Sequence, residues 1–482
     1  MPRYSLPQSR SPIRWHWPSR AYKRVARKDR EVRKLIKSLD QFIIKVLLAI
    51  IVVYVVLFGW LQAGGLHLEL PTLGFLVLLI PIWLIDGLKG LVESHMPSSY
   101  KTGTEDLSKV TVVVASKNSE SCIRKTIADL KQRFPPTNIL IASNGSTDST
   151  VSIIREMGVG GLEMPGIGKV RAINEAMAYV HTPYVLVLDD DTLIGDALIP
   201  TSLLDSTYEA VAFRVLVNTS TWVTKMQMYE YRKSTDIGKR YHNRGASVQN
   251  ISGAIGLFRK SELERQTRLH TGEFSGEDLQ RTLLIHMMAE NKGVVLTDST
   301  VYTDPPTKLR ELFKQRSLGW WPGMYANFTN YFRLIFKPGI PPALRIDAFY
   351  NVFLVMLMDI TRLLALPALI FYPWTFALMY VTYIGLETVT YLKSGHQDPY
   401  WVVMLYPFYG LFGFIARAVA FGVFAYRRLV ASIAKAIYFD DYRHASTFTK
   451  VAILLSLSLI FESILLLNNA IEYSQFVLSS IQ

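Results

Sequence analysis

The chain has 482 residues, of which 50% are hydrophobic, and its formal net charge is +13. The length exceeds what one hydrophobic core holds, and apolar runs of about 20 residues, each able to span a bilayer as a helix, argue against an entirely soluble protein. A single cysteine, Cys122, excludes an intrachain disulfide, and nine scattered histidines lack zinc-ligand spacing.

The positive charge is concentrated in residues 1–40, where twelve Lys or Arg face three acidic residues. This segment directly precedes the first apolar run, so positive-inside orientation and anionic lipid account for its charge. Nucleic-acid binding, the usual alternative for a basic protein, is therefore not expected. We expect a cytoplasmic segment whose first part is disordered and whose second part, Tyr22–Asp40, is a basic amphipathic helix on the membrane surface.

Residues 41–100 are expected to form a transmembrane hairpin. Phe42–Leu61 is the first apolar run and the second begins at Leu70, so the eight residues between them allow only a turn. With the N-terminus inside, the hairpin returns the chain to the cytoplasm before Lys101.

Residues 101–305 regain charge, and strand and helix patterns alternate there, which predicts a cytoplasmic α/β domain. Its first elements are expected to be a strand at Val110–Ala115, a helix at Glu120–Gln132, a strand at Ile139–Ala142 and a helix at Asp148–Glu156.

A third strand is expected at Tyr184–Leu188, an apolar run that ends abruptly in Asp189, Asp190 and Asp191. Its composition is typical of a buried strand in a parallel sheet, and open α/β sheets bind ligands at the carboxyl ends of such strands. Two carboxylates one residue apart can share one hard divalent cation together with substrate phosphates. The alternative is an acidic turn after a core strand.

Three further polar clusters lie in this domain, each with a structural and a functional interpretation. Ser143–Asp148 offers turn and capping chemistry, or backbone N–H groups beside a nucleotide. Gly168–Asn174 places Lys169 at a helix start, on a solvated basic face or against a diphosphate. Gly276–Leu279 opens a helix with two carboxylates, which either favour the helix N-terminus or include a general base.

Residues 306–344 are expected to form amphipathic helices at the membrane interface. Lys308–Arg316 is a basic helix that Pro322 is expected to interrupt, and Met324–Phe336 carries a wide aromatic stripe at helical spacing. The stripe suits a core helix or an interfacial one, and the apolar segments that follow favour the interface.

Residues 345–482 are expected to form the C-terminal transmembrane and channel region. Residues 346–392 are long enough for two spans, Trp401–Tyr426 either crosses the membrane or re-enters its cytoplasmic face, and Val451–Leu467 is the last span. Re-entry is favoured because it keeps the basic stretch 427–450 inside. The ionisable residues in these segments either pair or line a polar path for a glycan; they are Asp347, Asp359, Arg362, Glu387 and Glu462.

Taken in order, the motifs of residues 110–323 resemble those of family 2 glycosyltransferases. They are Ser-Asn-Gly-Ser-x-Asp, Gly-Lys-x-x-Ala-x-Asn, Asp-x-Asp, Ser-Gly-Ala at residues 252–254, Glu-Asp, and Gln-Arg before Trp-Trp. With apolar segments on both sides, the chain is most similar to membrane-integrated hyaluronan, cellulose and chitin synthases. No single motif is specific, so the resemblance depends on their order.

The resemblance implies an α/β GT-A fold, a Rossmann-like nucleotide-sugar transferase domain inserted in an α-helical multi-span membrane domain. It implies a nucleotide-sugar donor, a UDP-sugar rather than a GDP-sugar, with Mg²⁺ or Mn²⁺ as cofactor. The acceptor would be a growing glycan or a membrane lipid.

The resemblance also assigns roles to residues. Asp189 and Asp191 would hold the metal, and Asp278, beside Glu277, would be the catalytic base. Donor binding would fall to Ala115, Lys117, Asn118, Asn144, Lys169 and Asp189. The acceptor and diphosphate end would be formed by Gly253, Gln315, Arg316 and Trp320.

Three positions depart from the family pattern. Ser143-Asn144 replaces an acidic pair and Ala115–Asn118 replaces Pro-x-Tyr-Asn, which leaves the base open between uridine and guanosine. The usual Gln-x-x-Arg-Trp is changed so that Leu318 takes the arginine position and Trp320 comes one residue late, with Arg316 as the substitute cation.

The sequence therefore predicts a hexosyltransferase of the plasma membrane with a cytoplasmic catalytic domain. We expect a processive inverting polysaccharide synthase that exports its polymer. A non-processive enzyme that moves one sugar onto a membrane lipid is the alternative. A transport or scaffold protein with a degenerate transferase domain is a third class, which intact Asp189, Asp191 and Asp278 disfavour.

Overall fold

The computed structural model of the chain describes residues 86–267, 269–272, 276–288, 292–356, 373–394 and 398–438. The predicted N-terminal segment, the hairpin spans and the last span lie outside these residues, as do Asp359, Arg362 and Glu462.

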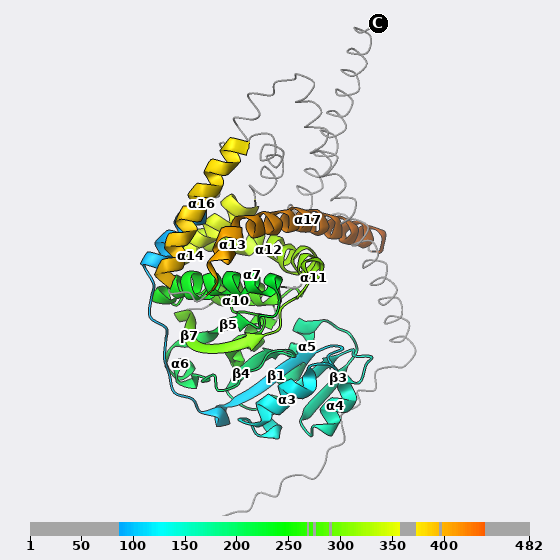
Figure 1. Cartoon of the computed structure of the whole chain (residues 1–482). Helices are drawn as coiled ribbons and strands as arrows, with labels where there is room; N and C mark the ends of the chain where they lie inside the picture. The colour runs from blue at the N-terminus through cyan, green and yellow to red at the C-terminus, as the bar shows by residue number, and fades with distance from the viewer. Residues whose placement is uncertain are drawn as a thin grey trace, which may run out of the picture.

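The domain is built on one seven-stranded sheet with the order β3-β2-β1-β4-β6-β5-β7 (Figure 1). Strands β1 to β4 run parallel, β6 is antiparallel to β4 and β5, and β7 is parallel to β5. The strands are β1 (Val110–Ser116), β2 (Ile139–Asn144), β3 (Gly160–Met164), β4 (Tyr184–Asp189), β5 (Tyr208–Val217), β6 (Ile255–Arg259) and β7 (Lys292–Thr303).

Helices cover both faces of this sheet because its central strands carry apolar residues on both sides. One core layer packs α3, α4 and α6 against the sheet, and the other packs α5, α9 and α10. The helices of the domain are α3 (Ile123–Lys131), α4 (Thr150–Glu156), α5 (Lys169–Ala176), α6 (Thr201–Ser206), α7 (Trp222–Arg232), π-helix η4 (Lys233–Lys239), α8 (Arg240–His242), α9 (Lys260–Thr267) and α10 (Glu277–Met288). Short 3₁₀ turns are η1 (Leu107–Lys109), η2 (Pro136–Asn138), η3 (Met177–Tyr179) and η5 (Asn243–Gly245).

The predicted strands at 110, 139 and 184 are confirmed, but both predicted helices begin later than expected. Helix α3 begins at Ile123, because the residues before it form a loop in which the Ser119 N–H donates to Thr150 Oγ1 at 2.8 Å. Helix α4 begins at Thr150, where the Asp148 carboxylate accepts from the Thr150 N–H at 3.1 Å. Ser119 and Asp148, which lie at the predicted helix starts, therefore stabilise the loops at the carboxyl ends of β1 and β2.

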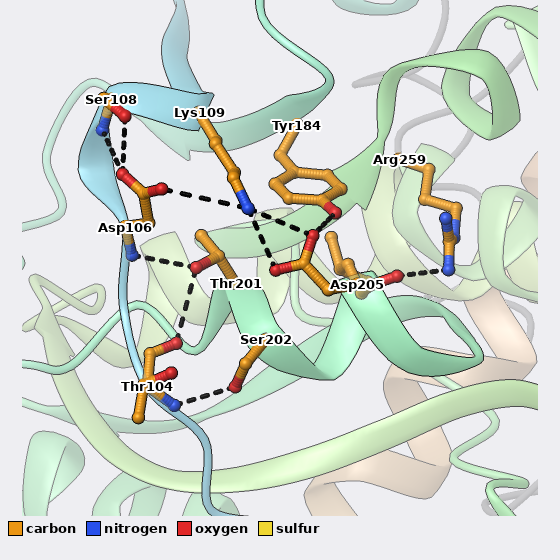
Figure 2. Close-up of polar contacts among 10 residues, drawn as sticks. Thr104, Asp106, Ser108, Lys109, Tyr184, Thr201, Ser202, Asp205 and Arg259 are labelled. Atoms are coloured by element: carbon orange, nitrogen blue, oxygen red, sulfur yellow. Dashed lines mark hydrogen bonds and ion pairs between the residues drawn. The ribbon is translucent and has the colours of Figure 1, made fainter.

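Polar contacts hold the chain at the amino ends of the central strands β1 and β4 (Figure 2). The Asp106 N–H donates to Thr201 Oγ1 at 2.9 Å, so the incoming chain is fixed to the start of α6. Lys109 Nζ lies 3.2 Å from an Asp205 oxygen, and the Tyr184 hydroxyl donates to the same carboxylate. These contacts anchor the amino ends of both strands and leave the carboxyl ends free for a site.

A second set of helices follows β7 and packs on the domain. They are α11 (Leu309–Lys314), π-helix η6 (Gln315–Trp320), α12 (Trp321–Ala326), α13 (Phe328–Phe336), α14 (Pro342–Phe349), π-helix η7 (Tyr350–Met356), α16 (Pro373–Ser394) and α17 (Tyr400–Tyr438). The prediction that Pro322 interrupts the first helix is wrong. The chain stays helical from Leu309 to Ala326, because Pro322 lies in the first turn of α12, where its missing N–H costs little.

The aromatic stripe is shared between core and surface. Tyr331 and Leu334 of α13 are buried in a cluster with α10, α12, α14 and α17, whereas Phe332 is 42% and Phe336 69% exposed. The helix therefore has one face on the protein and presents phenylalanine rings outward.

Helix α17 lies across the domain over α12, while α16 extends away from it (Figure 1). Trp401–Tyr426, for which crossing and re-entry were both open, falls within α17. Within the described ranges one segment, Tyr400–Arg428, is long and apolar enough to cross a membrane. Helix α16 carries strongly exposed apolar side chains, among them Leu378 and Leu392.

Two of the ionisable residues expected in the membrane region pair with the domain. Glu387 of α16 accepts from the Tyr229 hydroxyl and from Lys233 Nζ, both at 2.7 Å. Asp347 of α14 lies 3.2 Å from Lys89 Nζ and 3.2 Å from His242 Nε2. Both carboxylates tie the C-terminal helices to the domain.

Candidate active site

A cavity of about 710 Å³ lies at the carboxyl ends of the central strands and extends under the C-terminal helices. Nine of the residues singled out from the sequence line it: Lys169, Asp189, Asp191, Gly253, Glu277, Asp278, Gln315, Arg316 and Trp320. They come from β4, α5, α10, η6 and the segment before β6, which shows that the fold brings the separate motifs to one place.

Lys169 joins two of these motifs. Its ammonium lies 2.6 Å from Asp189 Oδ1 and 2.5 Å from Glu277 Oε1. Burial opposes ionisation of Glu277, but the neighbouring Lys169 charge holds the pKa of that carboxyl near 2. Burial raises the pKa of Asp189 despite the same partner. The first helical residue of α5 therefore supplies one positive charge to two carboxylates at the cavity wall.

Asp191 lies beside this cluster without a cationic partner. Its Oδ1 accepts from the Thr303 hydroxyl at 3.3 Å and from Thr192 at 3.4 Å, and no lysine or arginine of the described ranges forms an ion pair with it. Burial first, and then the Asp189 and Asp190 charges, raise the pKa of Asp191 to about 6. This environment favours a cation.

Asp190 does not line the cavity: β4 ends at Asp189, and Asp190 and Asp191 form a turn in which the Thr192 N–H donates to the Asp189 carbonyl at 3.3 Å. The Asp190 carboxylate accepts from the Ser119 hydroxyl and from the Lys117 N–H, the latter at 3.3 Å. Of the three consecutive aspartates, Asp190 therefore fixes the loop after β1, while its two neighbours line the cavity.

Asp278 is the second residue of α10, and its Oδ2 accepts from the Gly253 N–H at 3.0 Å. Burial and then the Glu277 charge raise the pKa of Asp278 to about 6. The adjacent carboxyls thus differ, with Glu277 ionised over most of the pH range and Asp278 able to take and release a proton near neutrality.

Four residues predicted to bind the donor do not line the cavity, and they lie in or directly after β1 and β2. Ala115 pairs with Asp189 in the sheet register, and Lys117 and Asn118 follow β1. The Asn144 side chain accepts from the N–H groups of Ile167 at 2.8 Å and Gly168 at 3.1 Å. Asn144 therefore positions the loop that leads into Lys169.

The altered Gln-Arg segment forms π-helix η6, which accommodates one more residue per turn than an α-helix would. Arg316 is 3% exposed, its guanidinium lies 3.7 Å from the centre of the Trp320 ring, and its Nη2 is 2.7 Å from Glu230 Oε2. The Tyr409 hydroxyl of α17 donates to the same Glu230 oxygen at 2.7 Å. The late tryptophan is therefore stacked on Arg316 at the cavity wall, and α17 contacts the same cluster.

Sequence reasoning missed Glu230, Thr303 and Lys239, all of which line the cavity. Glu230 and Lys239 lie within helical segments, and Thr303 ends a strand. None belongs to a motif, and only their tertiary position marks them.

Among the residues that the structure describes, two groups of side chains offer ligands for a metal. Asp189 and Asp191 face the cavity near Lys169, and Asp191 has the unpaired carboxylate described above. Glu93, His242 and Asp347 also have ligand atoms within 4.8 Å of one another, but Lys89 Nζ already lies 2.7 Å from Glu93. A cation in the second group would compete with that lysine, so the aspartates of β4 are the better donor set.

Residues 111–265 match the family model for glycosyl transferase family 2. Together with the mixed sheet, this match confirms the predicted GT-A-type domain and the predicted enzyme class, a glycosyltransferase.

The chain is also similar to polysaccharide synthases. Poly-β-1,6-N-acetyl-D-glucosamine synthase of Staphylococcus epidermidis is 28% identical over 176 residues, which cover 34% of this chain and 42% of that synthase. The synthase of the same name from Staphylococcus aureus strain COL is 27% identical over 168 residues, covering 33% and 41%. The match therefore spans less than half the length of these relatives.

Solved structures resemble the chain more distantly. The mannosyltransferase PcManGT of Pyrobaculum calidifontis, in complex with GDP-Man and Mn²⁺, aligns with a TM-score of 0.48 and 17% identity over 72% of this chain and 97% of that chain. Residues 1–349 of S. aureus TarS in complex with UDP-GlcNAc align with a TM-score of 0.35 and 16% identity, over 69% and 93%. Likenesses of this degree assign no ligand to the chain.

Proposed function

We propose that the chain is a processive, inverting hexosyltransferase that polymerises a sugar from a nucleotide-sugar donor and exports the polysaccharide across the membrane. The observation that carries this proposal is the single cavity in which Lys169, Asp191, Asp278 and Arg316 meet. One wall offers charges for a diphosphate, and another offers a carboxylate poised to accept a proton.

In the proposed reaction, an acceptor hydroxyl oxygen attacks the anomeric carbon of the donor sugar. The bond from that carbon to the diphosphate oxygen breaks, and the nucleoside diphosphate leaves. The hydroxyl proton passes to Asp278. This carboxyl suits the task because a general base works best with a pKa near the operating pH, and that of Asp278 is about 6.

Lys169 and Arg316 act on the leaving diphosphate, whose negative charge grows as the bond breaks. Donor phosphates would draw the Lys169 ammonium away from one of its two carboxylates. Lys169 would thus pair with the protein when the site is empty and with the donor when it is bound. Glu230 holds the Arg316 guanidinium against Trp320. The aromatic face beside it suits a sugar ring.

Mg²⁺ or Mn²⁺ fits the aspartates at the end of β4, because Asp191 is partly buried and lacks a cationic partner among the described residues. Asp191 would be the direct ligand, with Asp189 beside it. When bound, such an ion supplies positive charge that stabilises the leaving diphosphate.

Export is supported by the helices behind the site. Tyr400–Arg428 has the length and apolarity of a span, and Tyr409 of the same helix contacts Glu230 at the cavity wall. A glycan lengthened in the cavity would therefore be next to a membrane helix. This arrangement and the basic N-terminal segment support the proposal that the protein lies in the plasma membrane with its catalytic domain in the cytoplasm.

The similarity to poly-β-1,6-N-acetyl-D-glucosamine synthases favours a polymer over a single transfer. It makes UDP-N-acetylglucosamine the first donor to test and a growing glycan the first acceptor. Transfer of one sugar to a membrane lipid remains the alternative, since it would use the same catalytic residues.

The test is nucleotide release by the purified full chain, given UDP- and GDP-sugars one at a time with Mg²⁺ or Mn²⁺ and a crude lipid extract. Release with one donor, together with incorporation of its sugar into a product, is the expected result. A chain that binds no donor and releases no nucleotide under any of these conditions would instead be a transport or scaffold protein with a degenerate domain.

A further inference from the structure

Lys239 is a buried lysine at the cavity wall that the proposed chemistry does not use. It ends π-helix η4, is 8% exposed and lines the same cavity as Asp278. Burial lowers the pKa of its ammonium to about 8, although the Asp278 charge acts in the opposite direction. The side chain is thus a cation held in a poorly solvated place.

Lys239 differs from the other basic residues around the cavity. Lys169 pairs with Asp189 and Glu277, Arg316 with Glu230, and Lys233 with Glu387. Lys89 pairs with Glu93 and Asp347, and His242 with Asp347. Within the described part of the chain, the ammonium group of Lys239 forms neither a hydrogen bond nor an ion pair.

An unpaired cation in a desolvated place is costly, so buried charges usually have a partner of opposite sign. Asp278 does not fill this role, because no ion pair within 4 Å joins it to Lys239 and its own carboxyl is partly protonated near pH 6. Asn250 also lines the cavity, and its buried Oδ1 has no hydrogen-bond partner. A ligand that carries a hydroxyl or N–H group for Asn250 and a negative charge for Lys239 would satisfy both side chains.

In the proposed reaction the acceptor enters this cavity, where Asp278 takes its proton. The Asp278 charge also acts electrostatically on Lys239, which lines the same cavity. His242 and Asn351 line this cavity as well. An acceptor whose hydroxyl reaches Asp278 therefore shares the cavity with Lys239.

We propose that Lys239 binds a phosphate group carried by the acceptor. A single ammonium is a point charge of the kind that binds phosphate, whereas planar carboxylates favour the fork of an arginine. This inference rests on the proposed function and adds the chemical class of its acceptor. The phosphate belongs to a lipid-linked acceptor or to a phosphorylated glycan, and both present the same charge.

Binding measurements test this proposal without any need for catalytic turnover. Trp320 and Trp321 line the cavity, so quenching of tryptophan fluorescence reports occupancy in the full chain purified in a maltoside detergent. The probes are geranyl phosphate, uncharged geraniol, and N-acetylglucosamine 6-phosphate with its uncharged parent sugar. The variants are Lys239→Met, Lys239→Arg and, as the control, Lys225→Met, which removes an exposed lysine of α7.

We expect Lys239→Met to weaken binding of a phosphate probe by roughly tenfold to hundredfold, the range for a hydrogen bond to a charged group. The affinity of Lys239→Met for the matching uncharged probe should change far less. Lys239→Arg should keep most of the wild-type affinity for the phosphate probe, and Lys225→Met should match the wild type. Preference for geranyl phosphate assigns the phosphate to a lipid, and preference for the sugar phosphate assigns it to a glycan. Equal weakening of charged and uncharged probes, or no weakening, would overturn the proposal.

Thermal unfolding of the ligand-free variants separates a binding role from a structural one. Removing an unpaired buried charge should leave the midpoint of Lys239→Met equal to or above that of the wild type. A lower midpoint together with equal loss of all probes would mean that Lys239 is structural. Absence of nucleotide release in the donor panel would refute the proposed function, while these binding results would still decide the role of Lys239.

Discussion

Replacing Asp278 with asparagine separates its chemical role from its structural one. Asparagine has nearly the same shape, and its side-chain oxygen still accepts the Gly253 N–H that lies 3.0 Å from Asp278 Oδ2. The substitution removes the negative charge and, with it, the ability to take a proton. General bases contribute roughly 10²- to 10⁴-fold, so we expect nucleotide release to fall by that factor.

The same variant should be at least as stable as the wild type at high pH. The pKa of Asp278 is raised from 3.8 to about 6, so the ionised side chain costs the folded state stability above pH 6, and this cost disappears as the pH falls toward 4. The difference corresponds to about 3 kcal/mol before screening, and solvent in the cavity reduces it to about 1–2 kcal/mol. At a few degrees per kcal/mol, Asp278→Asn should unfold about 2–8 °C higher at pH 8 and at an unchanged temperature near pH 4.

Two assays check this pair of expectations. Nucleotide release is measured from pH 5 to 9, where the wild-type kcat/KM should rise through about pH 6 as Asp278 loses its proton. Thermal unfolding is measured at pH 4 and 8, with Asp298→Asn, which neutralises an exposed carboxylate of β7, as the matched control. Retention of more than a tenth of the activity, or a clear loss of stability at pH 8, would contradict the role given to Asp278.

Three further substitutions probe the remaining walls of the cavity. Lys169→Met should lower the free energy of unfolding by about 1–3 kcal/mol, since it leaves two partly exposed carboxylates unpaired, and it should weaken donor binding measured by calorimetry. The control is Arg171→Met, which replaces an exposed residue of the same helix. Equal behaviour of the two variants would contradict the role given to Lys169. Glu230→Gln should raise the KM for the acceptor and destabilise the protein by about 1–3 kcal/mol, because buried Arg316 loses its countercharge. The exposed control Glu311→Gln should change neither quantity. A normal KM in both variants would show that Glu230 is not part of the site. Chelation should stop nucleotide release until Mg²⁺ or Mn²⁺ is restored, and Asp191→Asn should lower the restored activity on the order of 10²-fold; activity that survives both treatments would rule out the proposed metal site.

The sheet and the carboxylate site were predictable because their signals are local. Apolar runs with β-branched residues mark β1, β2 and β4, and a run that ends in three aspartates can only place them at a strand end. The division of the three aspartates was not predictable in this way, because β4 ends at Asp189 and the turn that follows directs Asp190 to the loop after β1. The helix starts were less predictable because Ser119 and Asp148 serve the loops between strands as well as helix capping.

The rest of the cavity depends on tertiary contacts that no local pattern encodes. The spacing of Gln315, Arg316 and Trp320 looked irregular until the π-helix absorbed the extra residue and stacked the arginine on the ring. Glu230 reaches Arg316 across 86 positions of sequence, so only the folded chain reveals the pair. Lys239 sits in an ordinary polar stretch, and its burial follows from the elements that pack around η4.

The central claim is that one enzyme molecule adds many sugars before it releases its product, and the most direct test is the product size at low conversion. The purified chain is given its donor and a large excess of acceptor, and the labelled product is sized when only a small fraction of the acceptor has reacted. A processive synthase gives long chains beside unreacted acceptor from the first sample onward. A product that is one sugar longer than the acceptor in every sample would contradict the claim and would identify the chain as a single-sugar transferase.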